Sequence, residues 1–225
     1  MNLRAVRSYV VRAGRLTDAQ QRALTELWPR YGVPFAEAPL DLATLFARPA
    51  PCTLEIGFGN GEHLAARAQA EPARNFLGAE VHRPGIGRLL RAAAAAELDN
   101  LLIIDHDAVE VLRQQIAPGA LDEIQILFPD PWPKKRHHKR RLVSQATLAE
   151  LARVMRQGGE LRIATDVADY AQAIQLAVEQ QQGFRWTGAG FGDWRERGID
   201  WPPTRYEQKA LLEGRRCRYF RFQRR

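Results

Sequence analysis

The chain has 225 residues, of which 45% are hydrophobic, so it fits one α/β domain with an extension and cannot be wholly disordered. Its formal charge of +7 favours polyanionic partners such as nucleic acid or an anionic membrane surface. Two cysteines are too few for a disulfide scaffold or a cysteine-only zinc site, which favours the reducing cytoplasm, and no apolar run approaches the ~20 residues of a membrane-spanning helix.

Residues 1–50 form the first predicted unit, a basic arm followed by a short helical extension. The arm carries four arginines before the first acid of the chain: Arg4, Arg7, Arg12 and Arg15. Residues 17–28 then predict a helix that begins at a Thr17 or Asp18 cap. Prolines at 29, 34, 39, 49 and 51 indicate that the rest is a traverse and not a separate domain.

From residue 52 onward, short apolar runs alternate with helical patterns. Strands are predicted at residues 52–59, 75–82, 101–105, 121–128 and 159–166. The predicted helices lie at 61–71, 85–98, 109–116, 142–155 (ending at a Gly158-Gly159 turn) and 167–180. Two closing strands, 184–188 and 216–223, flank a loop rich in Gly, Pro and Trp. This order predicts that residues 51–225 form a Rossmann-like, doubly wound, mostly parallel seven-stranded sheet with helices on both faces.

A glycine-rich loop follows the first predicted strand and reads Glu55-Ile-Gly57-Phe-Gly59-Asn-Gly61. Glycines at such a turn allow a tight backbone and the close approach of a ligand. A dinucleotide-binding loop would look similar, but Glu62 replaces its third glycine and Glu55 would repel a pyrophosphate. Glu55 suits S-adenosylmethionine, which carries an ammonium and a sulfonium and no phosphate. The loop therefore favours that cofactor over a nicotinamide dinucleotide.

Five consecutive predicted strands end in or near an acid: Glu55, Glu80, Asp107, Asp130 and Asp166. Glu80 is placed to bind ribose hydroxyls, and the Asp107-Ala108 step could offer a carboxylate or a backbone amide to an adenine. Any one of these acids could simply cap a helix. Together they favour a shared ligand site at the carboxyl ends of the strands.

The fourth predicted strand runs into Phe-Pro-Asp130-Pro-Trp132, where prolines fix the backbone and hold the aspartate in place. This loop resembles the Asn/Asp-Pro-Pro-aromatic loop of methyltransferases that act on amino groups and ring nitrogens. Trp132 could stack on a base, although packing inside the protein is the more common role. After Pro133, the eight residues Lys134–Arg141 contain six Lys or Arg and two His, and a phosphate backbone would offset their repulsion.

Several segments follow one another as they do in the bacterial tRNA (guanine-N7-)-methyltransferases, which the chain resembles from about residue 50 to residue 225. They read EIGFGNGEHL, GAEVHRPGIG, DHDA, FPDPWPKKRHHKRR, ATDVADYA and TRYEQKALLEG. The opening RSYVVRAGRLT also looks like the basic arm of that family. The Asp-Pro-Trp loop with its basic tail and the Thr-Arg-Tyr-Glu segment are the most specific of these motifs.

The resemblance implies a class I methyltransferase fold, S-adenosylmethionine as cofactor, and a guanosine in the tRNA variable loop as substrate. Asp130 would have the central catalytic role. The cofactor would contact Glu55, Gly57, Gly59, Gly61, Glu80, Asp107, Ala108 and Asp130. The substrate would contact Lys134, Asp166, Thr204, Arg205, Tyr206 and Glu207. The RNA would be held by Arg136, His137, His138, Lys139, Arg140 and Arg141.

Methylation at guanine N7 needs no base, because N7 already exposes a lone pair. The transfer is then an in-line displacement that depends mainly on alignment. Because the product ring becomes cationic, nearby carboxylates stabilise the developing charge. We expect Asp130 to orient or electrostatically support the guanine, and Asp166 and Glu207 to accept hydrogen bonds from it. The five histidines lack metal-site spacing, so no metal is expected.

Three other functions remain open on the sequence. A small-molecule N-methyltransferase would share the glycine loop and the acids, but would have no use for the basic run. An inactive RNA-binding protein is disfavoured by the presence of Glu55, Glu80 and Asp130. A nicotinamide-dependent oxidoreductase is disfavoured by Glu55 and Glu62. We expect a monomer, with a homodimer as the alternative.

Overall fold

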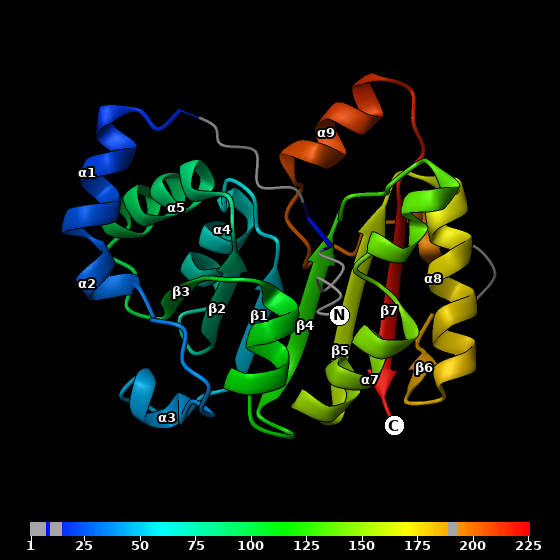
Figure 1. Ribbon diagram of the computed structural model, residues 1–225, viewed down its shortest axis with the longest axis horizontal. Coiled ribbons are helices and arrows are strands. Elements are labelled where there is room, and N and C mark those ends of the chain that lie inside the picture. The colour runs from blue at the N-terminus through cyan, green and yellow to red at the C-terminus, as the bar shows by residue number, and fades with distance from the viewer. Residues whose placement is uncertain (1–7, 10–14, 189–192) are drawn as a thin grey trace, which may run out of the picture.

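The computed structural model describes residues 8–9, 15–188 and 193–225, and contains a seven-stranded sheet (Figure 1). Its strands are β1 (Cys52–Ile56), β2 (Asn75–Glu80), β3 (Leu101–Asp105), β4 (Leu121–Leu127), β5 (Met155–Thr165), β6 (Phe184–Trp186) and β7 (Arg218–Arg224). They lie in the order β3-β2-β1-β4-β5-β7-β6. Strands β1 to β5 pair in parallel, and β7 is antiparallel to both of its neighbours. The predicted fold class is confirmed.

Two apolar cores cover the two faces of this sheet. On one face, Phe76 and Ile103 pack against α4 (Glu62–Ala70), α5 (Arg83–Ala95) and α1 (Asp18–Glu26). On the other face, Leu54 and Ile163 pack against the helical turns at 108–115, α7 (Gln145–Val154) and α8 (Ala168–Gln181). Among the residues described here, no helix has both the length and the apolar character needed to cross a bilayer.

From residue 15 onward, the N-terminal extension packs against the rest of the domain. Helix α1 begins at a Thr17 capping box, and α2 (Trp28–Tyr31) and α3 (Leu42–Leu45) follow. Gln20 Nε2 donates to the Pro84 carbonyl at 3.0 Å. The amide of Val33 donates to the Ile103 carbonyl at 2.8 Å, beside the outer strand β3. The arginines predicted at 4, 7 and 12 lie outside the described residues, and Arg15 is exposed.

Several predicted elements differ from those observed. The helix predicted at 109–116 is a short α6 (Ala108–Glu110) followed by a π-helical turn, η1 (Val111–Gln115). Helix α7 ends at Val154 because Met155 already pairs with Leu121 of β4, so strand β5 begins before the glycine pair. The first strand ends at Ile56, where the glycine loop begins. The loop predicted before β7 contains a helix, α9 (Arg205–Leu212).

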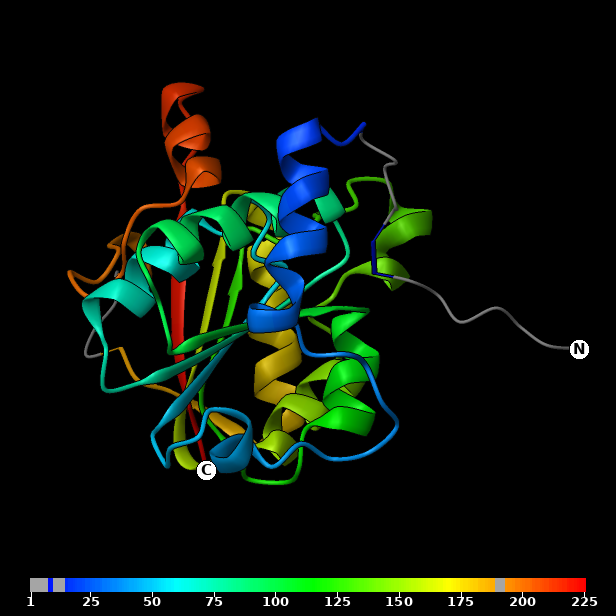
Figure 2. The same cartoon turned by 90° about the vertical axis from the view of Figure 1, so that its left-hand side faces the viewer.

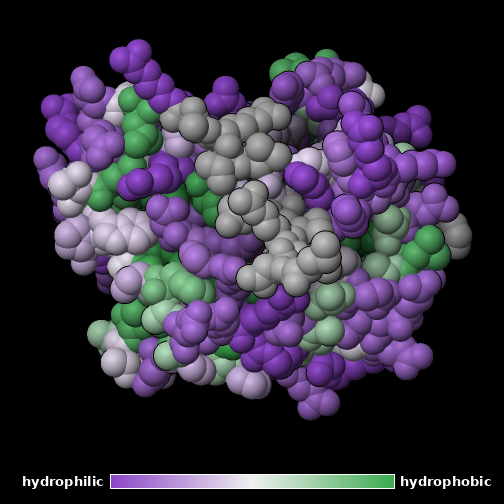
Figure 3. Space-filling model, viewed as in Figure 1, coloured by the Kyte–Doolittle hydropathy of each residue, from purple (hydrophilic) through white to green (hydrophobic). Residues whose placement is uncertain are grey.

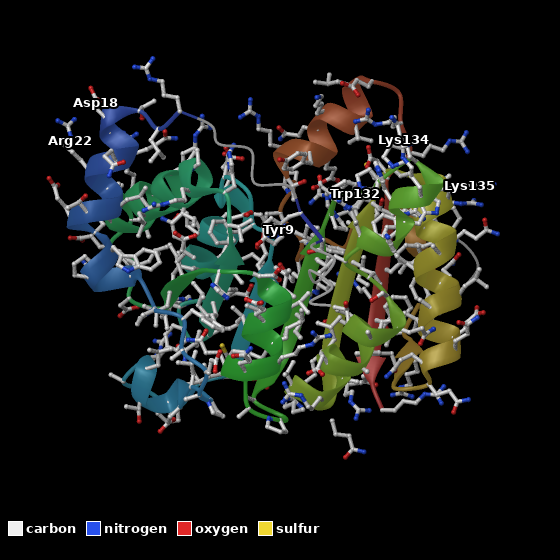
Figure 4. The ribbon with its side chains drawn as sticks, viewed as in Figure 1. Tyr9, Asp18, Arg22, Trp132, Lys134 and Lys135 are labelled. Atoms are coloured by element: carbon white, nitrogen blue, oxygen red, sulfur yellow. The ribbon has the colours of Figure 1, made fainter. Side chains whose placement is uncertain are left out.

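Helix α9 stands above the carboxyl ends of the parallel strands, as Figures 1 and 2 both show. Figure 4 places Trp132, Lys134 and Lys135 near the same edge, on the chain that follows β4. The parallel strands therefore bring the glycine loop, the Asp130 loop and α9 to one edge of the sheet. Ligands bind at this edge in proteins of this architecture.

Candidate active site

The glycine loop turns at three glycines that all have left-handed backbone angles. The φ angles of Gly57, Gly59 and Gly61 are +72°, +58° and +76°. Gly61 is the N-cap of α4, and a Cβ there would lie 2.7 Å from Leu89. At Gly57, by contrast, a Cβ would meet no atom within 4 Å. Left-handed angles are strained for any residue with a side chain, so this path requires glycine. The loop thus presents bare backbone to open space at Gly57.

The acids predicted at the strand ends do lie at one edge of the sheet, but their partners differ. Glu80 accepts hydrogen bonds from the amides of Gly59 at 2.8 Å, Val81 at 2.7 Å and His82 at 2.9 Å. Asp107 caps α6 by accepting from the amide of Val109 at 2.8 Å. In this structure Glu80 thus supports the glycine loop, while Asp107 has the ordinary role of a helix cap.

Among the acids predicted at the strand ends, Glu55 lines a pocket. Its side chain is buried, and its Oε2 lies 2.9 Å from Nδ1 of His63. The pocket is bounded by the glycine loop, the start of α4, the end of β4 and the first turn of α9. Its lining residues are Glu55, Gly57, Phe58, Asn60, Glu62, His63, Leu127, Thr204, Arg205 and Tyr206. This pocket unites three of the predicted segments, EIGFGNGEHL, the end of β4 and TRYEQKALLEG.

The Asp130 loop is held by two residues in left-handed conformations. Phe128 has φ +52° and Trp132 has φ +46°, which is unusual for aromatic residues. Such conformations persist where the surrounding structure enforces them, often at functional sites. The Asp130 side chain is exposed and makes no hydrogen bond or ion pair with the described residues. The loop thus holds a free carboxylate next to the ligand-binding edge.

The Trp132 side chain packs against other residues of the protein. Its Nε1 donates to the Ser8 carbonyl at 3.0 Å, and the Arg140 guanidinium lies 4.8 Å from its ring centroid. The His137 ring meets it edge-on at 5.7 Å. Tyr9, next to Ser8, is near Trp132 in Figure 4. These contacts favour the packing role of Trp132 over base stacking, and they bring residues 8–9 to the Asp130 loop.

Arg141 does not have the exposed position that the expected contact with RNA requires. Only 8% of it is exposed. Its Nε donates to the Pro131 carbonyl at 2.9 Å, and its Nη2 bonds to Asp169 Oδ2 at 2.6 Å. The guanidinium also lies 4.7 Å from the Tyr170 ring centroid. Arg141 therefore ties the Asp130 loop to α8, and we do not assign it to RNA.

Four other residues of the basic run remain available to a partner, whereas His137 and Arg140 contact Trp132. They form a 3₁₀ turn, η2 (Lys135–Arg140), and the side chains of Lys134, Lys135, Arg136 and Lys139 are exposed. Burial and the cations around it hold the pKa of His137 below its ordinary value, so this ring is neutral at neutral pH. The space-filling view shows a hydrophilic surface over this part of the molecule (Figure 3).

The Thr204–Glu207 segment forms the start of α9 and is a capping box. The Thr204 side chain accepts from the Glu207 amide at 3.0 Å, and Glu207 accepts from the Thr204 amide at 3.2 Å. Glu207 also accepts from Arg197 Nε at 2.9 Å and from the Tyr219 hydroxyl. Its carboxylate is 3% exposed and already engaged. The structure therefore does not support our expectation that Glu207 accepts a hydrogen bond from the guanine amino group.

The remaining predicted substrate residues lie around the pocket or beside it. Tyr206 is exposed, and its ring lies 3.5 Å from the position that a Cβ on Gly59 would take. Arg205 lines the pocket from the side of α9. Asp166, after β5, pairs with Arg215 Nε at 2.7 Å, a partner that the sequence did not suggest. Within the described part of the chain, no three His, Cys, Asp or Glu residues are grouped to hold a metal.

Comparison with known proteins identifies the family. A family model described as a putative methyltransferase matches residues 49–218. The tRNA (guanine-N(7)-)-methyltransferase of Xanthomonas campestris pv. campestris strain 8004 is 54% identical over 180 residues, covering 80% of this chain and 69% of that protein. The protein of that name from Nitrosococcus oceani strain ATCC 19707 is 46% identical over 222 residues, covering 98% and 92%. This chain belongs to the tRNA (guanine-N(7)-)-methyltransferase family.

Solved structures show the same fold at low sequence identity. The 16S rRNA methyltransferase KamB has a TM-score of 0.55 at 15% identity, covering 95% of both chains. The antibiotic-resistance methyltransferase Kmr has a TM-score of 0.56 at 19% identity, covering 87% of this chain and 98% of its own. At these identities the likeness shows the fold alone. It agrees with the class I methyltransferase fold that the family resemblance implies.

The methyl donor of this family is S-adenosylmethionine, and the pocket fits that cofactor. The buried Glu55 carboxylate suits a cationic group, and the open space over Gly57 allows a ligand to approach the backbone. His63 adds a buried ring nitrogen, Nε2, that has no partner among the described residues. Glu80 Oε1 already accepts from two amides, but Oε2 accepts from the Gly59 amide alone and keeps a second lone pair, so we propose that Oε2 also accepts from a ribose hydroxyl.

Gly85 supports the cofactor loop through a contact that the sequence did not reveal. A Cβ on Gly85 would lie 1.9 Å from the Gly59 carbonyl oxygen, so α5 touches the loop backbone to backbone. We expect Gly85→Ala to push the loop out of place and to weaken S-adenosylhomocysteine binding about 10-fold or more, measured by calorimetry. Its control is Gly87→Ala on the same helix, where a Cβ meets Gln20 of α1 at 3.0–3.2 Å and not the loop. Equal affinities for the two variants would contradict this role of Gly85.

Proposed function

We propose that this protein transfers the methyl group of S-adenosylmethionine to N7 of a guanosine in the variable loop of tRNA, acting as a cytoplasmic monomer. The observation that carries the proposal is the placement of three features on one edge of the sheet. The Glu55 pocket follows β1, the Asp130 loop follows β4, and the exposed cations of η2 come directly after that loop. This placement supports the proposal, because a pocket for the methyl donor, a loop for the reaction and a surface for phosphates would then be neighbours.

The residues around the pocket account for the chemistry without a general base. S-adenosylmethionine supplies an electrophilic methyl group, and guanine N7 supplies the lone pair. Because the purine gains positive charge during transfer, an anionic group nearby lowers the barrier. Asp130 is such a group, since its carboxylate is exposed and unpaired among the described residues. The Arg141 bond to Pro131 holds its loop in place, so less entropy is lost when the guanine is aligned.

The family relatives and the basic turn favour tRNA over the other functions left open by the sequence. Both relatives named above are called tRNA (guanine-N(7)-)-methyltransferases, and together they align with nearly all of this chain. A small-molecule enzyme would have no need for the four exposed cations at Lys134, Lys135, Arg136 and Lys139. An inactive RNA-binding protein would have no need for the buried Glu55 pocket.

The proposed function is tested by methyl transfer to unmodified tRNA. Purified protein is incubated with tritiated S-adenosylmethionine and a tRNA transcript, and the product is digested to nucleosides. We expect the label in 7-methylguanosine, and none when the variable-loop guanosine is replaced by adenosine. Label in another nucleoside, or equal label in the mutant transcript, would contradict the proposal.

Neutralising the exposed part of η2 should change how tRNA binding depends on salt. We expect the double variant Lys135→Ala, Lys139→Ala to reduce the slope of log K against log salt by roughly 0.7–0.9 for each phosphate that the protein no longer neutralises. The matched control is Arg185→Ala. Arg185 pairs with Gln223 in the sheet, and Gln223 pairs with Glu160 in the middle of β5, away from its carboxyl end at Thr165. A slope unchanged in the double variant, or lowered equally in the control, would exclude a phosphate-binding role for η2.

A further inference from the structure

His63 carries a polar atom for which the protein itself provides no partner. The residue is 4% exposed, lies in the first turn of α4, and lines the pocket beside Glu55. Its Nδ1 is 2.9 Å from Glu55 Oε2, whereas its Nε2 is buried without a partner in the described residues. A buried polar atom left unpaired destabilises a protein, and most such atoms are satisfied. A ligand in the pocket would supply the missing partner.

The bond to Glu55 decides what His63 can offer such a ligand. A carboxylate only accepts hydrogen bonds, so Nδ1 must carry the hydrogen in this pair. In the neutral ring, Nε2 then holds a lone pair and is an acceptor. The pocket therefore presents two neighbouring acceptors, the Glu55 carboxylate and His63 Nε2.

A primary ammonium matches this pair of acceptors. It carries three N–H donors on one charged atom and can bond to both groups at once. The rest of the pocket agrees with this assignment, because Glu62 adds a further acid near α4. Arg205 is the one Lys or Arg among the lining residues, and it belongs to α9 and not to β1 or α4.

We propose that His63 Nε2, together with Glu55, binds the ammonium group at the amino-acid end of the cofactor. The proposal rests on the proposed function, because it assumes that S-adenosylmethionine occupies the Glu55 pocket. It makes His63 a cofactor-binding residue with a second role, which is to hold the Glu55 carboxylate in position through Nδ1.

Two substitutions separate these roles. His63→Asn places an amide nitrogen near the position of Nδ1, so Glu55 keeps its partner while Nε2 is removed. His63→Gln places its amide near Nε2 and restores an acceptor there. We expect His63→Asn to weaken S-adenosylhomocysteine binding about 10- to 100-fold, as for a hydrogen bond to a charged group, and His63→Gln to recover part of the affinity. Dissociation constants come from calorimetry on variants whose thermal unfolding shows that they are folded.

Three ligands identify the group that His63 contacts. S-adenosylhomocysteine carries an ammonium and a carboxylate, its decarboxylated analogue carries only the amine, and 5′-methylthioadenosine carries neither. We expect His63→Asn to weaken the first two ligands by similar factors and to leave the third within about 2-fold of the wild-type protein, since His63 makes no hydrogen bond to it. Weakening of the first ligand alone would place Nε2 at the carboxylate and overturn the proposal.

Two other outcomes would also overturn it. Equal weakening of all three ligands would mean that His63 only supports the glycine loop. Unchanged affinity for all three would mean that Nε2 makes no contact with the cofactor. Failure of the wild-type protein to bind any of the three would instead count against the proposed function, because the adenosine part is common to them all. The two failures are therefore distinguishable.

Discussion

Replacing Asp130 by alanine is expected to lower the rate of methyl transfer about 100- to 1000-fold, the usual effect of removing one group that stabilises transition-state charge. The affinity for S-adenosylmethionine should stay within a few-fold of the wild-type value. Asp130 does not line the Glu55 pocket, and its exposed carboxylate makes no hydrogen bond with the described residues. Its removal therefore disturbs no contact that holds the pocket together.

The conservative variant Asp130→Asn tests whether charge or shape is required. Asparagine has the same size as aspartate and keeps one acceptor oxygen. If Asp130 only orients the guanine, Asp130→Asn should therefore keep much of the wild-type rate. Because the guanine ring becomes cationic, we expect Asp130→Asn to be nearly as slow as Asp130→Ala. Rates are measured in single turnovers at saturating tRNA and cofactor. The control is Glu179→Ala, an exposed acid late in α8, which should be neutral. Normal turnover with weakened cofactor binding in Asp130→Ala would contradict this role.

The sequence predicted the strands and helices that position this site, because strand–helix alternation is a local pattern. Each strand ends where its apolar run ends, so the positions of Glu55, Glu80 and Asp107 at one edge follow from the parallel topology. The partners of these acids could not be predicted. Glu80 bonds to the Gly59 amide across 21 residues, and this depends on how two loops meet in space.

The same limit applies to Arg141 and Glu207, which we expected to contact RNA and substrate and which are buried and paired in the structure. Arg141 belongs to a run of cations, and only its distance to Asp169 on α8 shows that it is buried and paired. Glu207 stands in a Thr-x-x-Glu spacing, which is the local signature of a capping box. That spacing would have predicted α9, although it could not have predicted the bonds from Arg197 and Tyr219.

His63 shows a third kind of limit. In the sequence it is one of five histidines without metal-site spacing, and nothing near it marks it as different. Its significance comes from an unpaired buried nitrogen, which only a packed structure can show. The same holds for Gly85, whose requirement for glycine comes from contact with the Gly59 carbonyl.

A second large effect is expected away from the site, at Glu123 in β4. This carboxylate is 4% exposed and lies between two arginines that are themselves buried, Arg67 of α4 and Arg162 of β5. It bonds to Arg67 Nη2 at 3.2 Å, and its Oε1 lies 3.2 Å from Arg162 Nε. Burial alone would raise the pKa of Glu123, but the two arginines outweigh it and hold the pKa below its ordinary value.

Glu123→Ala should therefore lower the free energy of unfolding by about 3 kcal/mol, because it removes the counter-ion that the two buried guanidinium groups share and leaves them only their more exposed acidic partners. Glu123→Gln should cost less, since the amide still accepts hydrogen bonds. The control is Arg156→Ala, which breaks an exposed pair with Asp122 and should cost about 1 kcal/mol or less. Urea unfolding at pH 7 measures all three. A destabilisation by Glu123→Ala no larger than that of the control would mean that these more exposed partners are sufficient for the buried arginines.

The pH dependence of that destabilisation gives an independent test of its electrostatic origin. Because the folded-state pKa of Glu123 lies below the ordinary value of 4.5, its contribution is complete well above pH 4.5 and is lost as the pH falls through the folded-state pKa. The difference in unfolding free energy between the wild-type protein and Glu123→Ala should therefore shrink as the pH is lowered from 6 toward the acid limit of folding. A difference that stays constant over this range would trace the effect to the missing side-chain volume, because a cavity does not titrate.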